Sequence, residues 1–262
     1  MEEQHIASAF DRDLEAIQAR IMKMGGLVEA AIIDAARALE TSDEELALEV
    51  RTRDKAIDSL EELINEEAAR LIAIRSPTAG DLRLVLSVMK ISANLERIGD
   101  YAKNMAKRTV VLAQGPTVSE GTSALRRMAR EVERMLKDAL DAYIQRDVDL
   151  AADVIARDHD VDQMYNALFR EFLTFMMEDP RNITPCMHLH FIAKNTERMG
   201  DHVTAIAEQV VYLVTGERPD ESRNKADITS TKAQETVPYK HLTVPPNRAG
   251  QTPGGARTGK KK

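Results

Sequence analysis

Apolar residues recur every three or four positions along most of the first 216 residues of the chain. That spacing places them on one face of an α-helix. Clusters of Gly, Pro and Ser interrupt the pattern and divide the stretch into six helices. We expect these helices over residues 5–39, 42–74, 81–113, 122–145, 147–177 and 184–216. The pattern predicts an all-α chain.

Local sequence signals mark the ends of several helices and one close approach. Ser42, with Glu45 three residues later, has the form of a capping box, so we expect Ser42 to begin the second helix. Thr184 followed by a proline is a good start for the sixth helix. Gly25 and Gly26, inside the first helix, predict a kink or a close helix crossing.

Composition supports helix-on-helix packing. Aromatic residues make up only 4% of the chain and Trp is absent, whereas sheet cores are enriched in aromatic and β-branched residues. The net charge is −7, and five of the positive charges lie between Arg248 and Lys262, so the remainder is more acidic still. Such a body is a poor match for a nucleic-acid backbone. The single cysteine excludes a disulfide framework and a thiolate metal cage.

Nothing in the sequence predicts export or membrane insertion. Residues 1–11 are charged and lack the apolar core of a signal peptide. No apolar stretch approaches the roughly 20 residues that span a bilayer. We therefore expect a cytoplasmic protein that meets a membrane only through a partner.

Two segments of the chain occur twice. The sequence RDKAID at 53–58 returns as RDHDVD at 157–162, and NLERIGD at 94–100 returns as NTERMGD at 195–201. Order and spacing agree, so we predict two tandem three-helix bundles related by internal duplication. The expected division is a first repeat over 1–116, a second repeat over 117–216 and a disordered tail over 217–262. Five of the nine prolines lie in that tail.

The repeated segments carry pairs of acidic residues four positions apart, which stack on one helix face. These eight carboxylates are Asp54, Asp58, Glu96, Asp100, Asp158, Asp162, Glu197 and Asp201. Like charges at this spacing are mildly unfavourable, so something should compensate them. A solvated face would do so through neighbouring arginines, namely Arg53, Arg97, Arg157 and Arg198.

The duplication favours a cation site over a solvated face. Both repeats keep both acidic pairs on helices expected to be neighbours, and Gly99 and Gly200 lie beside them at a cost of about 1 kcal/mol each relative to Ala. Four carboxylates per repeat are hard oxygen ligands that suit Mg, Ca, Mn or Fe. On the third helix the acidic pair continues an apolar row that we expect to face the core. That row consists of Leu82, Leu86, Met89 and Ala93.

The two repeats are not identical around the acidic pairs. Glu61 and Glu62 of the first repeat correspond to Tyr165 and Asn166 of the second, and a nearby row histidine, His190, occurs only in the second. The two sites are therefore expected to differ in affinity or in the number of metal ions.

The doubled N-x-E-R-hydrophobic-G-D heptad, with both R-D-x-x-hydrophobic-D segments, resembles the PhoU family of phosphate-transport regulators. The resemblance covers about residues 5–216. It implies a PhoU-like fold of two three-helix bundles, a cytoplasmic homodimer and, in some members, multinuclear metal sites at the same eight carboxylates, with divalent or trivalent Fe, Mn or Mg. The implied role is non-enzymatic: it couples the phosphate transporter ATPase subunit to a sensor histidine kinase and keeps phosphate-starvation genes off. No nucleic-acid partner is implied.

Three other functions are weighed against this one. A di-iron carboxylate enzyme or iron store uses Glu-x-x-His on two helices, but the only such spacing here joins Glu2 to His5. A nucleophilic hydrolase would rest on Cys186, near His188 and His190 at the start of the sixth helix, although a buried bystander cysteine is far commoner. A helical adaptor without metal would keep normal partner binding after the carboxylates are neutralised.

Overall fold

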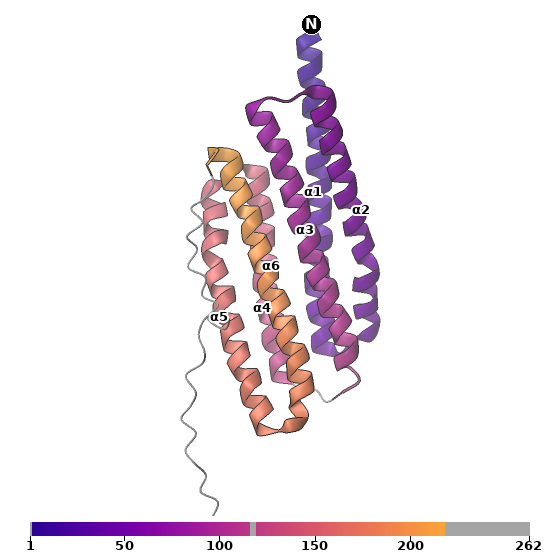
Figure 1. Ribbon diagram of the computed structural model, residues 1–262, viewed down its shortest axis with the longest axis vertical. Coiled ribbons are helices and arrows are strands. Elements are labelled where there is room, and N and C mark those ends of the chain that lie inside the picture. Colours follow the sequence, from indigo (N-terminus) through magenta and orange to yellow (C-terminus); the bar gives the residue numbers. More distant parts are fainter. Residues whose placement is uncertain (1, 116–118, 218–262) are drawn as a thin grey trace, which may run out of the picture. The chain divides into compact units, whose positions relative to one another are not determined.

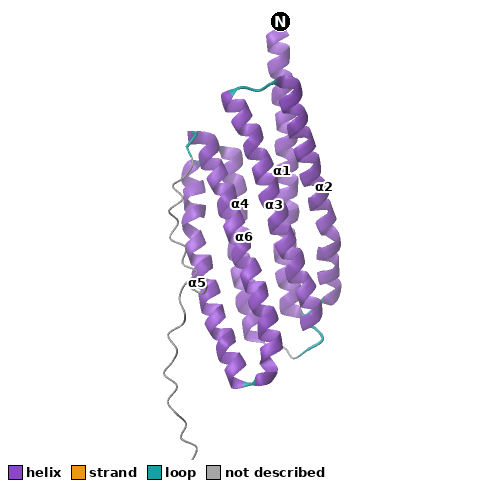
Figure 2. Ribbon diagram, in the orientation of Figure 1, coloured by secondary structure: helices purple, strands orange, loops and turns teal. Residues whose placement is uncertain are grey.

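The structure, a computed structural model, describes residues 2–115 and 119–217. These residues form six α-helices and one short 3₁₀ turn, and they contain no strand (Figure 2). The helices are α1 (Glu2–Thr41), α2 (Glu44–Arg75), α3 (Ala79–Leu112), α4 (Ser119–Gln145), α5 (Val148–Glu178) and α6 (Ile183–Thr215), with the turn η1 (Pro180–Asn182) before α6. The prediction of an all-α fold with six helices is confirmed.

The second helix of each repeat begins in the same way. Asp43 before α2 and Asp147 before α5 each accept a hydrogen bond at 2.9 Å from the backbone N–H three residues later. The preceding residues, Ser42 and Arg146, turn the chain with a positive φ of 53° and 57°. The predicted capping box of Ser42 and Glu45 is therefore wrong. An N-cap residue needs an extended backbone, and Asp43 has one whereas Ser42 does not.

The start of α6 also differs from the prediction. The helix begins at Ile183 rather than Thr184, because η1 leads directly into it. Asp179 caps that turn by accepting a hydrogen bond from the backbone N–H of Arg181 at 2.9 Å. At the other end, Gly216 adopts the left-handed conformation that closes the helix, with φ 81°.

Helices α1–α3 pack together, as do α4–α6, and all six belong to one compact unit. Figure 1 shows α3 and α6 side by side, with α1 and α4 behind them. Helices α3 and α6 run in opposite directions, as two contacts show: the beginning of α3 lies against the end of α6, and the end of α3 lies against the beginning of α6. Arg83 lies 5.5 Å from the ring centre of Tyr212, and Arg108 lies 4.3 Å from that of Phe191.

Helices α1 and α4 are antiparallel as well. Gly25 packs against Leu140, and further along Glu40 pairs with Arg126. Two opposed pairs relate the repeats by a rotation close to two-fold. On the α3–α6 side this axis passes near Tyr101 and His202, which directly follow the two heptads and whose ring centres are 5.7 Å apart.

The apolar row on α3 faces the core only in part: Met89 packs against the core, whereas the prediction is wrong for Leu86 and Ala93. Leu86 is 44% exposed and Ala93 is exposed. The buried residues of α3 lie on adjoining faces and include Val85, Val88 and Leu95. The periodicity misleads here because α3 contacts α1, α2 and α6, so apolar residues occupy several of its faces and no single stripe stands out.

None of the described helices combines the length and the apolar composition that crossing a membrane requires. The predicted disordered tail, apart from Glu217, lies outside the described residues. The expected division of the chain at residue 116 stays a prediction.

Candidate functional site

The eight predicted carboxylates form two groups, one in each repeat. The first acidic cluster consists of Asp54 and Asp58 on α2 with Glu96 and Asp100 on α3. The second acidic cluster consists of Asp158 and Asp162 on α5 with Glu197 and Asp201 on α6. In each repeat, therefore, two neighbouring helices supply one acidic pair each.

A glycine brings the two helices close together at each cluster. A Cβ added to Gly99 would lie 3.1 Å from Cδ1 of Ile57 and 3.6 Å from Oδ1 of Asp54. One added to Gly200 would lie 3.3 Å from Cγ1 of Val161 and 3.4 Å from Oδ1 of Asp158. Each glycine thus removes a side chain where a carboxylate of the neighbouring helix approaches the backbone. In the sequence these two glycines stood out by their cost inside a helix, which did not say what lies against them.

Lys103 joins the helices of the first acidic cluster. Its ammonium donates one hydrogen bond to Asp100 on its own helix at 2.6 Å and another to Oδ2 of Asp54 on α2. Arg97 lies at the rim of the same cluster, 3.5 Å from Glu96 and 3.8 Å from Asp100. Two basic side chains therefore offset part of the negative charge.

Burial is the largest influence on the pKa values of Asp54 and Glu96 in the first acidic cluster. It raises the pKa of Asp54, with a further increase from the charges of Asp58 and Asp100, against the lowering effect of Lys103. Burial also raises the pKa of Glu96, reinforced by the charge of Asp100 and a hydrogen bond to it. The paired carboxylates raise the pKa of Lys103 above its ordinary value despite its own burial, so this lysine is charged at neutral pH.

The second acidic cluster lies deeper in the protein. Asp158, Asp162 and Glu197 are all buried, and only Asp201 is partly exposed. Lys194 donates to Oε1 of Glu197 at 2.9 Å. Burial raises the pKa of Glu197, and the charges of Asp201 and Asp162 raise it further, whereas Lys194 lowers it. The carboxylates of this cluster thus bear a larger desolvation cost for their charge.

The basic partners differ from those expected. Arg53 pairs with Asp34 at 2.8 Å, and Arg157 pairs with Asp138, so these two arginines tie α2 to α1 and α5 to α4. Among the expected arginines, Arg97 is the one with a described ion pair to a cluster carboxylate. Sequence reasoning missed the lysines that do most of this work. Lys103 follows Asp100 by three residues and Lys194 precedes Glu197 by three, but this spacing is too common on helices to single them out.

The donors suit a hard cation, although their present geometry is not that of a formed metal centre. Within the described residues, no three His, Cys, Asp or Glu side chains converge closely enough to hold a metal ion. Each cluster nevertheless contains a buried carboxylate oxygen that receives no hydrogen bond, Oδ1 of Asp54 and Oε2 of Glu197. A buried anionic oxygen in that state is costly, and a cation is one way to satisfy it.

The histidines and the cysteine occupy other surroundings. His190 packs against Phe169, with ring centres 5.2 Å apart, and Nδ1 of His202 lies 2.8 Å from Oδ1 of Asn94 across the α3–α6 contact. Cys186 is fully buried, and burial raises the pKa of its thiol. A shielded, protonated thiol is a poor nucleophile, which weakens the hydrolase alternative. The side chains of Glu2 and His5 lie outside the described residues.

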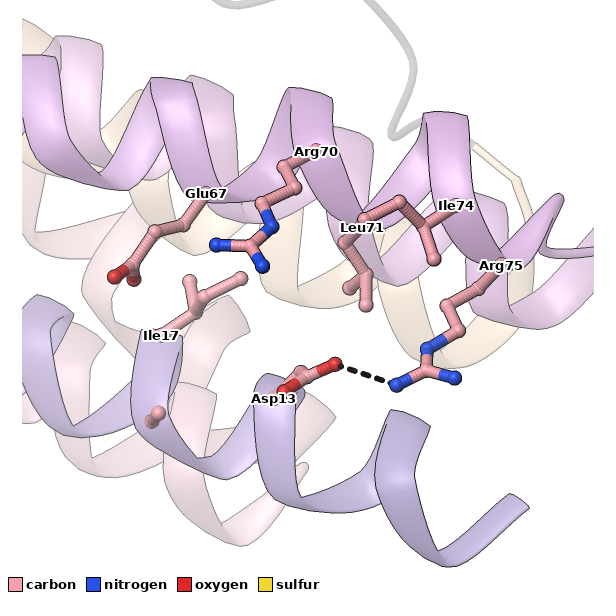
Figure 3. A pocket seen from close by; sticks show the side chains of 8 residues that line it. Asp13, Ile17, Glu67, Arg70, Leu71, Ile74 and Arg75 are labelled. Atoms are coloured by element: carbon pink, nitrogen blue, oxygen red, sulfur yellow. Dashed lines mark hydrogen bonds and ion pairs between the residues drawn. The ribbon is translucent and has the colours of Figure 1, made fainter. Parts of the chain in front are cut away.

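One cavity lies away from both clusters, between α1 and the end of α2. It measures about 230 Å³ and has Ile17, Leu71 and Ile74 among its walls. In Figure 3 the ion pair between Asp13 and Arg75, at 3.3 Å, spans one side of it. The cavity shares no residue with either acidic cluster.

Both repeats match one known protein family in sequence. Residues 21–109 and 125–210 each match the PhoU domain. A Rhizobium meliloti protein described as a phosphate-specific transport system accessory protein PhoU homolog is 46% identical over 238 residues, which is 88% of this chain and 98% of that protein.

Two crystal structures have the same architecture. PhoU from Pseudomonas aeruginosa superposes with a TM-score of 0.77 at 41% identity, over 79% of this chain and all of that one. The phosphate transport system regulatory protein PhoU from Streptococcus pneumoniae gives 0.74 at 31% identity, over 80% of this chain and 99% of that one. The chain belongs to the PhoU family.

Proposed function

We propose that this protein regulates phosphate uptake as the accessory protein of a phosphate-specific transport system. The observation that carries the proposal is the match of both repeats to the PhoU domain, together with relatives named for that system. The match extends over nearly the whole length of those relatives, so the likeness is to entire proteins rather than to one shared module.

The finer proposal is that the protein acts without catalysis, by docking from the cytoplasm. It would couple the transporter ATPase subunit to a membrane sensor histidine kinase, and it would work as a homodimer. A long, charged helical surface suits contacts of this kind, because charged rims speed association and make it sensitive to salt. When phosphate is plentiful, such contacts restrain import and silence starvation genes.

We further propose that each acidic cluster binds a hard cation such as Fe, Mn or Mg. Asp54, Asp58, Glu96 and Asp100 would hold it in the first repeat, and Asp158, Asp162, Glu197 and Asp201 in the second. The unsatisfied buried oxygens of Asp54 and Glu197 support this role. The cation would neutralise facing carboxylates and so clamp two helices together.

A metal-free helical adaptor is the second candidate, favoured by the two lysines that already partner the clusters. Elemental analysis of protein purified without chelator or nickel resin separates the two candidates. The metal proposal expects Fe, Mn or Mg in stoichiometric amounts, with the share of the second cluster lost on changing Glu197 and Asp201 together to Gln and Asn. Metal-free protein that folds and docks normally would support the adaptor.

Gene deletion tests the regulatory role. We expect the deletion strain to express phosphatase and transporter genes even in high phosphate, and the wild-type gene to restore repression. A variant changed only at an exposed residue away from the clusters, Glu178→Gln, controls for expression level and should also restore it. Normal repression in the deletion strain, with no second copy in the genome, would refute the proposal.

A further inference from the structure

The position that Lys103 occupies in the first acidic cluster has no lysine in the second repeat, where Lys194 partners the cluster from the other side of the heptad motif's glutamate. The ammonium of Lys103 contacts Asp54 and Asp100, which belong to the two helices that the cluster joins. The matching position of the second repeat, also three residues after the heptad, is Thr204. The hydroxyl of Thr204 is buried and donates to the backbone carbonyl of Gly200 at 3.0 Å, so that position contributes no charge.

The surroundings of Asp54 indicate a cation-binding place rather than a simple surface ion pair. Asp54 is only 5% exposed, Oδ2 receives the hydrogen bond from Lys103, and Oδ1 is buried without one. Gly99 lets this carboxylate lie against α3. The ammonium of Lys103 thus satisfies one of the two oxygens that a divalent or trivalent metal ion would bind.

We propose that Lys103 is a built-in counter-cation that competes with metal for the first acidic cluster. This inference rests on the proposed metal function. An ammonium and a divalent ion repel each other at contact distance, so metal enters only as Lys103 withdraws. The lysine side chain is 32% exposed and has a long flexible stem, which allows its head to move into water.

Two consequences follow for the first repeat. Its cluster is held together without metal, and its affinity for metal is lower than its four carboxylates alone would give. Removing the lysine should reverse both. In wild-type protein, metal must displace two charge-assisted hydrogen bonds of Lys103. Without the lysine that cost disappears, so we expect metal to bind about 10- to 100-fold more tightly.

The experiment compares Lys103→Gln with Lys107→Gln in full-length, chelator-treated protein. Lys107 lies one turn further along α3, is exposed, and is the matched control for loss of one positive charge. Mn²⁺ binding is measured by calorimetry and by electron paramagnetic resonance, and melting temperature is measured with and without Mn²⁺. We expect Lys103→Gln to gain the tighter binding and to melt lower without metal but be restored by it. Lys107→Gln should behave as wild type.

A double variant that carries Asp54→Asn as well as Lys103→Gln tests whether the tighter Mn²⁺ binding belongs to the first acidic cluster. In that variant the tighter binding should disappear. If wild-type protein binds Mn²⁺ and both lysine variants bind it equally well, the role of Lys103 is refuted while the metal function stands. If neither wild-type protein nor either lysine variant binds Mn²⁺ up to millimolar concentrations, the metal function is refuted, and the role of Lys103 falls with it.

Discussion

Adjacent glycines in α1 meet different surroundings, so the same substitution should have opposite effects. A Cβ at Gly25 would lie 2.4 Å from Cδ1 of Leu140, a buried side chain of α4, whereas one at Gly26 would have nothing within 4 Å. Gly25→Ala should therefore lower the free energy of unfolding by about 1–3 kcal/mol through overpacking. Gly26→Ala should raise it by about 0.5–1 kcal/mol, because alanine restricts the unfolded chain. Urea denaturation of the two variants measures both, and equal effects would show that α1 and α4 are not in close contact here.

Glu197 predicts a dependence of stability on pH in chelator-treated protein. Because burial raises its pKa above the ordinary 4.5, the folded protein holds this proton to higher pH than the unfolded chain does. The associated stability is present below pH 4.5 and is lost as pH rises through the folded pKa. The stability of Glu197→Gln relative to wild type should therefore increase as pH rises from 4.5 to neutrality.

Denaturation curves across that range test this expectation. Glu178→Gln, at an exposed position on α5, controls for loss of one negative charge from the whole chain. A stability difference between Glu197→Gln and wild type that stays constant or shrinks with rising pH would show that burial does not govern this carboxylate.

For individual residues, the sequence pointed to the important glycines and carboxylates but did not predict which side chains partner them. Gly99 and Gly200 could be singled out because a glycine inside a helix needs a reason. Lys103 and Lys194 could not, because a lysine three residues from an acid is common on any exposed helix. Only the burial of Asp54 and Glu197 distinguishes these ion pairs from ordinary surface ones.

The helices themselves were the most predictable part, since their apolar spacing is long and regular. Their ends were less so, because local backbone conformation decides which of several polar residues becomes the cap. At the start of α2, serine, aspartate and glutamate follow one another closely, and the left-handed turn at Ser42 leaves the cap to Asp43. The orientation of α3 was unpredictable from its own residues because three helices cover it.

The recurring cap offers a test at the level of one element. Replacing Asp147 by alanine removes the side chain that accepts from the backbone N–H of Leu150, leaving one donor of α5 without that acceptor. We expect the free energy of unfolding to fall by about 1 kcal/mol. Asp149→Ala, an exposed change in the first turn of the same helix, should cost only a few tenths of a kcal/mol. Comparable losses in thermal denaturation would contradict the capping role.

The contact between repeats can be tested by a double-mutant cycle. Leu140→Ala leaves a cavity in the buried α1–α4 contact and should cost about 2–5 kcal/mol. It also removes the side chain that a Cβ at position 25 would strike. Gly25→Ala should then cost much less in the Leu140→Ala background than alone, with a coupling of at least about 0.5 kcal/mol. Additive losses in urea denaturation would place the two residues apart.

At the scale of the whole molecule, the duplication could be predicted from the sequence, whereas the contact between the two repeats could not. Repeated motifs at 53–58 and 157–162 reveal two units, but nothing in their spacing says which helices pair across them. This contact, the seam between the repeats, pairs α1 with α4 and α3 with α6. It includes small and apolar residues, such as Gly25 and Leu140, which resemble any other core positions. Its polar pairs join residues about a hundred positions apart, as Asn94 with His202, and no local pattern links them.

The opposed directions of α3 and α6 place Tyr101 beside His202, its own counterpart in the other repeat. Two separate single-repeat chains meeting through this seam would form an isologous pair, in which every residue faces its copy and every mutation appears twice. Joining them in one polypeptide makes that association independent of protein concentration. It also lets each side change alone. A tyrosine can then face a histidine, and a lysine can be kept in one copy where the other has a threonine, so one ancestral surface can evolve toward two different tasks.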